Sequence, residues 1–128
     1  MNGNAEELFQ TEGYELLCAA FEVYHHLGSG FLEEVYQEAL ELELSARGIP
    51  FISRPKLQVS FKDQFLKKHY EADLLVYSEI VVELKSARTL APEHEAQLLN
   101  ELKATRKRVG YLINFGSAPR LQWSRRVL

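Results

Sequence analysis

The spacing of apolar residues predicts two helices in the first half of the chain. From Thr11 onward, apolar positions recur every three or four residues, as on a helix with one buried face: Leu17, Ala20, Phe21, Tyr24 and Leu27. Gly28 predicts the end of this helix, because glycine readily adopts the left-handed conformation of a helix C-terminus. A second helix is expected from Ser29 or Gly30 to about Arg47, with these side chains inward: Leu32, Val35, Tyr36, Ala39, Leu40 and Leu44.

The period changes to that of strands in the middle of the chain. Residues 57–61 alternate between apolar and polar, which predicts a half-buried strand followed by a turn at Asp63-Gln64. A longer strand is expected over 65–76 and a third over 80–85. These are followed by a helix from Pro92 to about Arg106 and an almost wholly apolar strand over 109–115. The order α-α-β-β-β-α-β predicts an α/β domain with a mixed central sheet.

Length and composition predict one soluble domain covering residues 1–128. The chain has no collagen period, no low-complexity tract and no apolar run near the ~18 residues of a membrane span. Its first seven residues lack the basic and apolar regions of a secretion signal. A single cysteine, Cys18, suits a reducing compartment, so a cytoplasmic location without membrane attachment is expected.

Charge is divided unevenly along the chain, although the net charge is only −3. Residues 1–50 hold ten glutamates and one basic residue, whereas no acidic residue follows Glu101 and the segment 117–128 is basic. Such a division suggests a basic face for an anionic partner, with nucleic acid as the leading candidate. The alternative is an acidic helix pair that simply packs beside a basic region.

Polar residues interrupt the otherwise apolar strands, and three of them could share one face. Glu83 and Lys85 are two residues apart in a strand, so their side chains point the same way. A three-residue loop at 77–79 would place Asp73 opposite Glu83, and one at 78–80 would place it opposite Lys85. A two-residue loop at 78–79 would instead turn Asp73 to the other face.

Two carboxylates beside an ammonium group suit a hard divalent cation. Packed carboxylates repel each other unless a cation lies between them, and Mg²⁺ or Mn²⁺ favours such oxygen ligands. The cation would activate water and stabilise charge on a phosphate, which predicts phosphodiester hydrolysis. The structural alternative is a surface salt pair on an edge strand.

Four segments of the chain resemble one nuclease family. Asp73 followed by Glu83-Leu84-Lys85 resembles the core motif of the PD-(D/E)XK nuclease superfamily. Residues 30–36 resemble the Gly-x-x-Glu-x-x-Tyr segment of its GxxExxY branch, and residues 94–100 and 110–115 resemble that branch's helical His-x-x-Gln segment and closing strand. The similarity runs from about residue 14 to 116, and Ala72 replaces the proline of the superfamily motif.

The resemblance implies a restriction-endonuclease-like core, in which a mixed sheet is flanked by helices, and a role for each motif residue. Asp73 and Glu83 would bind Mg²⁺ or Mn²⁺, with Glu33 as a further acid at the metal. Lys85 would position the attacking water, and Gln97 would assist from the following helix. Glu71 and Glu101 stand where the branch often has a basic residue and a tyrosine, so both add negative charge near the site.

The sequence therefore predicts a divalent-metal-dependent nuclease, with DNA as the favoured substrate and RNA as an alternative. Two other hypotheses remain open: a catalytically silent module that binds nucleic acid or a protein, and a small structural or regulatory subunit. The small size also leaves a homodimer open, which would present two sites for two strands.

Overall fold

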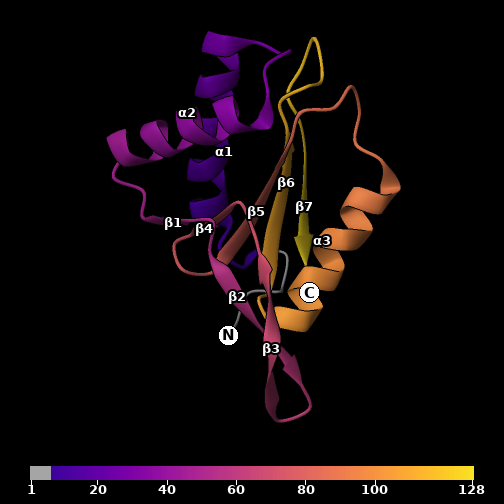
Figure 1. The fold of residues 1–128 in the computed structure, drawn as a ribbon. Coiled ribbons are helices and arrows are strands. Elements are labelled where there is room, and N and C mark those ends of the chain that lie inside the picture. The colour runs from indigo at the N-terminus through magenta and orange to yellow at the C-terminus, as the bar shows by residue number, and fades with distance from the viewer. Residues whose placement is uncertain (1–6) are drawn as a thin grey trace.

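The computed structural model describes residues 7–128 and has three layers. Helices α1 (Gln10–Leu27) and α2 (Glu33–Ala46) cover one face of a five-stranded sheet, and α3 (Pro92–Thr105) covers the other (Figure 1). The predicted α/β class and element order are confirmed. The prediction that the first seven residues carry no secretion signal falls mostly on residues 1–6, which lie outside the described residues.

The central sheet is mixed. Its strands lie in the order β1 (Phe51–Ser53), β4 (Leu74–Val76), β5 (Ile80–Lys85), β6 (Val109–Asn114) and β7 (Gln122–Val127). Only β5 and β6 run parallel, because α3 provides the crossover between them. The strands β2 (Lys56–Phe61) and β3 (Gln64–Glu71) form a separate hairpin. The two edge strands, β1 and β7, were not predicted from the sequence.

The side chains of β5 alternate between two apolar cores. The sequence predicted only that residues two apart in this strand share a face. Ile80, Val82 and Leu84 pack in the larger apolar cluster beneath α1 and α2. Val81 packs in the smaller cluster beneath α3. Because residues two apart share a face, Glu83 and Lys85 lie on the α3 side of the sheet.

The first two helices differ from the prediction in their start and in their buried faces. Helix α2 begins at Glu33 instead of Ser29 or Gly30, because Leu32 has an extended backbone with ψ of 154°. Leu32, Val35 and Phe21 were expected to point inward and are exposed.

No helix within residues 7–128 combines the length and apolar character needed to cross a bilayer.

The single strand predicted over 65–76 is divided between two sheets. Strand β3 ends at Glu71 and pairs with β2, whereas β4 begins at Leu74 and pairs with β1 and β5. The break falls at Ala72-Asp73, where the backbone bonds cross to the segment before β2: the amide of Ala72 donates to the carbonyl of Pro55 (3.2 Å). The turn between β2 and β3 lies at residues 62–63 instead of 63–64.

Candidate active site

A three-residue loop connects β4 and β5 and sets the register of the site. The loop occupies residues 77–79, and Tyr77 and Ser78 both have positive φ, of 54° and 64°. The ladder pairs Leu74 with Val82, so the next position outward places Asp73 opposite Glu83. Of the three registers that the sequence allowed, the structure has the one that places the two carboxylates directly opposite each other.

Three hydrogen bonds hold Asp73 at the end of β4. Its Oδ2 accepts from the backbone N–H of Leu84 in β5 (2.6 Å). Its carbonyl oxygen accepts from the backbone N–H of Arg54 (2.9 Å) and from Nε2 of Gln37 in α2 (2.7 Å). The Asp73 carboxylate therefore accepts the hydrogen bond that a backbone carbonyl would otherwise accept from Leu84. The β4–β5 ladder accordingly ends at the pair Leu74–Val82.

Gln37 is a positioning residue that the sequence reasoning missed. It is buried, and its Nε2 also donates to Oε2 of Glu41 (2.8 Å), so that α2 is tied to the backbone of Asp73. Gln37 lies four residues after Glu33, and this spacing puts both side chains on one helix face. The four-residue spacing from Glu33 could have predicted that Gln37 lies near the site.

Glu83 lies among other carboxyl groups in a buried environment. Burial raises the pKa of Glu83 to about 10, with further contributions from hydrogen bonding and charge at Glu101 and then at Asp73. Glu101 of α3 is only 5% exposed. Among the described residues, Oε2 of Glu83 and Oε1 of Glu101 are buried without a hydrogen-bond partner. Unpaired buried carboxylate oxygens are costly, so this cluster is short of positive charge.

Lys85 is half-buried on the same face as Glu83 and is not part of a salt pair. Strand β5 lies in the middle of the sheet, and within residues 7–128 the structure has no ion pair that involves Lys85. Both observations contradict the structural alternative of a surface salt pair on an edge strand. The ammonium group is therefore available to a ligand.

Two small hollows contain the predicted site residues. The first has a volume of about 110 Å³ and is lined by Glu71, Glu83, Lys85, His94, Gln97, Leu98, Glu101 and Leu112. The second, of about 70 Å³, is lined by Glu33, Glu34, Gln37, Arg54, Asp73 and Leu84. Glu83, Lys85 and Gln97 thus come together on the α3 side, while Glu33 meets Asp73 on the α2 side. The Asp73–Glu83 pair links the two hollows.

The donor set around Asp73 and Glu83 fits a magnesium-type ion with few protein ligands. No group of three or more His, Cys, Asp or Glu side chains in residues 7–128 is arranged to bind a metal. Mg²⁺, however, commonly takes only one or two carboxylates and completes its shell with water and phosphate oxygens. The unpartnered oxygens of Glu83 and Glu101 are the observation that favours a cation at this place.

Tyr36, in the segment that resembles the GxxExxY motif, has a structural role. It is fully buried and stacks on Phe115 with ring centroids 4.6 Å apart. Its hydroxyl donates to the carbonyl of Gly28 and accepts from the backbone N–H of Phe31 (3.3 Å). These bonds hold the connection that precedes Glu33. His94 also has a local role, since its Nδ1 accepts from the N–H of Ala91 at the start of α3 (3.1 Å).

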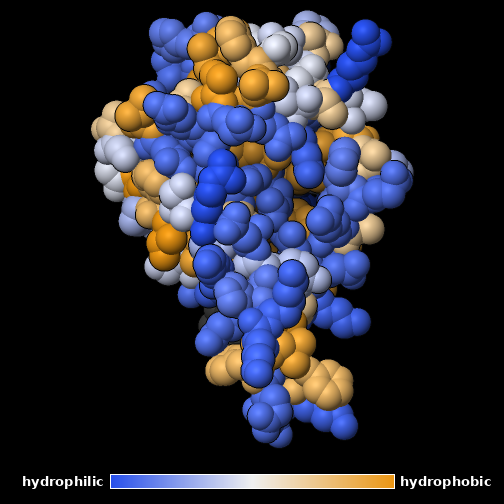
Figure 2. Space-filling model, viewed as in Figure 1, coloured by the Kyte–Doolittle hydropathy of each residue, from blue (hydrophilic) through white to orange (hydrophobic). Residues whose placement is uncertain are grey.

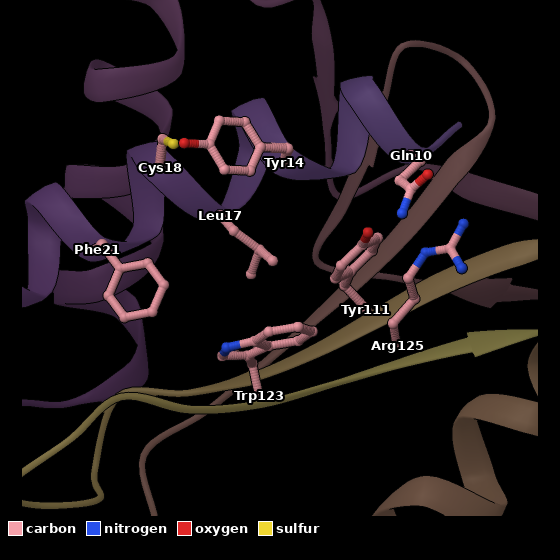
Figure 3. A pocket seen from close by; sticks show the side chains of 8 residues that line it. All are labelled: Gln10, Tyr14, Leu17, Cys18, Phe21, Tyr111, Trp123 and Arg125. Atoms are coloured by element: carbon pink, nitrogen blue, oxygen red, sulfur yellow. The ribbon is translucent and has the colours of Figure 1, made fainter. Parts of the chain in front are cut away.

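A larger apolar pocket lies between α1 and β7, on the face of the sheet that α1 and α2 cover. It has a volume of about 320 Å³ and is lined by Gln10, Tyr14, Leu17, Cys18, Phe21, Tyr111, Trp123 and Arg125 (Figure 3). In Figure 3 the rings of Phe21 and Trp123 and the side chain of Leu17 border a common space. Among residues 7–128, no carboxylate lines this pocket.

Comparisons with known proteins agree with the observed fold. The model of the PD-(D/E)XK nuclease superfamily matches residues 10–126. The chain belongs to this superfamily. Among solved structures, SSO0001 superposes with a TM-score of 0.58 at 18% identity, which shows a shared fold. The match covers 93% of this chain, which spans 59% of the length of SSO0001. None of the curated proteins matches the chain.

Proposed function

We propose that the protein is a divalent-metal-dependent nuclease that hydrolyses phosphodiester bonds in DNA. The observation that carries the proposal is the position of Asp73, just before β4, opposite Glu83 in β5. Lys85 lies on the same face as Glu83 and forms no ion pair within residues 7–128. Membership of a nuclease superfamily supports the reaction class. The segment 30–36 further supports placing the chain in the GxxExxY branch.

Asp73 and Glu83 are the metal ligands in this proposal, and Glu33 assists directly or through a water molecule. A bound Mg²⁺ or Mn²⁺ would lower the pKa of a coordinated water and offset negative charge on the phosphate. Asp73 is held in place by Leu84 and Gln37, so its carboxylate needs little rearrangement. The ammonium group of Lys85 orients the attacking water and neutralises developing charge. Gln97, an exposed residue that lines the hollow of Glu83 and Lys85, contacts the substrate.

Cleavage assays test this function. Labelled single- and double-stranded DNA and RNA are incubated with the protein in Mg²⁺, in Mn²⁺ or in EDTA, together with the Asp73→Asn variant. We expect cleavage of DNA in either metal, none in EDTA, and a loss of at least about a hundredfold in the variant. A Glu38→Gln variant removes one carboxylate from the exposed side of α2 and is expected to cut normally. Binding of nucleic acid without cleavage in either metal would instead favour a catalytically silent module.

A further inference from the structure

The β2–β3 hairpin extends away from the three-layered body. It forms a sheet of its own and projects at the lower end of the molecule in Figure 1. Its base is anchored, because Leu57 and Tyr70 pack in the apolar cluster beneath α3. Every residue from 61 to 69 is exposed. The outer part of the hairpin therefore makes little contact with the core of the domain.

The exposed part of the hairpin combines lysines with apolar rings. Residues 56–70 contain Lys56, Lys62, Lys67 and Lys68 but only one acidic residue, Asp63. The sequence pattern predicted that Phe61 would be half-buried, but it is 60% exposed, and Phe65 is 68% exposed. In Figure 2 the end of the hairpin accordingly shows hydrophilic and hydrophobic residues side by side.

Strand geometry places a cation beside an apolar side chain on each face of β3. Residues two apart share a face, so Lys67 lies with Phe65 and Lys68 lies with Leu66. The ammonium group of Lys62 lies over the ring of Phe61, 5.5 Å from its centroid. Within the part of the chain that the structure describes, no cation lies over the ring of Phe65, which is also the more exposed of the two rings.

The end of α3 adds basic residues to the same region. The guanidinium group of Arg106 donates to the carbonyl of Lys62 (2.8 Å) at the turn of the hairpin. A hollow of about 510 Å³ lies between the hairpin and this helix end, and Lys56, Phe65, Arg106 and Lys107 are among its lining residues. A second copy of the chain would bring two such basic surfaces together, and like charges repel. A polyanion fits better, and exposed rings among lysines are typical of surfaces that bind nucleic acid strands.

The hairpin is joined directly to the proposed metal site. Strand β3 is followed by Ala72 and then by Asp73, while Glu71 at its end lines the hollow of Glu83 and Lys85. The eight residues of β3, at roughly 3.3 Å each, span about 25 Å between the turn and Glu71, which lies two residues before Asp73. A nucleic acid strand bound along the hairpin would therefore reach Asp73 and Glu83 several nucleotides away from the nucleotide bound near the turn.

We propose that the β2–β3 hairpin is the nucleic-acid-binding arm of this site. Lys67 binds backbone phosphates on the face where the ring of Phe65 stacks on an unpaired base, and Lys68 attracts the same polyanion from the other face of β3. This inference rests on the proposed nuclease function for the identity of the substrate.

Fluorescence anisotropy with labelled 20-nucleotide single-stranded DNA and the matching duplex tests the lysines. Binding is measured in EDTA, so that cleavage does not contribute. We expect the Lys67→Ala/Lys68→Ala variant to bind about tenfold more weakly at roughly 100 mM salt, with the slope of log affinity against log salt smaller by between about 1 and 2. The control is Arg47→Ala/Lys103→Ala, which removes the same charge from exposed positions outside both the hairpin and the basic segment 117–128. The proposal is overturned if the two double variants bind alike, or if the wild type binds neither DNA.

The stacking role of Phe65 is tested by alanine substitution against a matched aromatic control. Tyr14 is 69% exposed on α1, close to the exposure of Phe65, so Tyr14→Ala removes a comparable ring elsewhere. Phe65→Ala is expected to weaken single-stranded binding by about tenfold and duplex binding much less, because stacking requires an unpaired base. Equal affinities of the two variants would overturn this role.

These measurements separate the arm from the catalytic proposal. Metal-dependent cleavage with unchanged binding by the hairpin variants would refute the arm and leave the nuclease intact. Hairpin-dependent binding without cleavage in Mg²⁺ or Mn²⁺ would support the arm and refute the nuclease.

Discussion

Replacing Lys85 with alanine is expected to slow DNA cleavage by about a thousandfold without weakening Mn²⁺ binding. The ammonium group lies on the α3 face with Glu83 and is not committed to an ion pair among residues 7–128. It is therefore assigned to the water and the developing charge, and not to the cation. Single-turnover rates at saturating Mg²⁺ and calorimetric titration with Mn²⁺ measure the two effects separately.

The matched control for this substitution is Lys103→Ala, which removes an exposed lysine from α3. We expect this variant to cleave at the wild-type rate. A Lys85→Ala variant that cleaves within about threefold of the wild type would contradict the assigned role, since positioned proton-transfer groups contribute at least ~100-fold. Parallel loss of cleavage and Mn²⁺ affinity would show instead that Lys85 maintains the site's structure.

The Glu83→Gln variant is expected to have a higher free energy of unfolding than the wild type in the absence of metal, and this difference should grow as the pH rises. Burial raises the pKa of Glu83 to about 10, above its usual value of 4.5. Between these values the folded state holds a proton that the unfolded state has released, so the free energy of unfolding falls with increasing pH. Glutamine removes this penalty, and near pH 8 we expect a gain on the order of 2 kcal/mol, with little difference near pH 4.

Urea unfolding in EDTA at a series of pH values measures this gain. Glu38→Gln on the exposed side of α2 is the control, and it is expected to unfold like the wild type throughout. With excess Mg²⁺ the order should reverse, because only the wild type gains stability from metal held by Glu83. A gain that is independent of pH, or equal in the control, would show that the carboxyl is not held in its protonated form.

The sequence predicted strand β5 and the shared face of Glu83 and Lys85 because strand alternation is a local property. The bounds of β5 agree with the structure, since the run of apolar residues ends at the polar ones that form the site. For Asp73, the sequence allowed three alternative registers relative to the strand of Glu83 and Lys85 and did not decide between them. The register depends on the positive φ angles of Tyr77 and Ser78, which neither residue type indicates from its sequence context.

Features that depend on distant contacts could not be predicted in this way. The break at Asp73 results from bonds to Arg54, Gln37 and Leu84, which come from three different elements. Strand β7 lies in a basic segment without clear alternation and is held by pairing with β6. Glu101 stood out only as a departure from a family pattern, and its burial beside Glu83 required the packing of α3 on the sheet.

Anomalous X-ray diffraction from crystals soaked in Mn²⁺ at pH 8 tests the metal site most directly. We expect a Mn²⁺ peak within coordinating distance of a carboxylate oxygen from Asp73 and another from Glu83, and no peak there in Asp73→Asn crystals. Strong Mn²⁺ peaks confined to other surface carboxylates would contradict a hydrolytic site built on this pair.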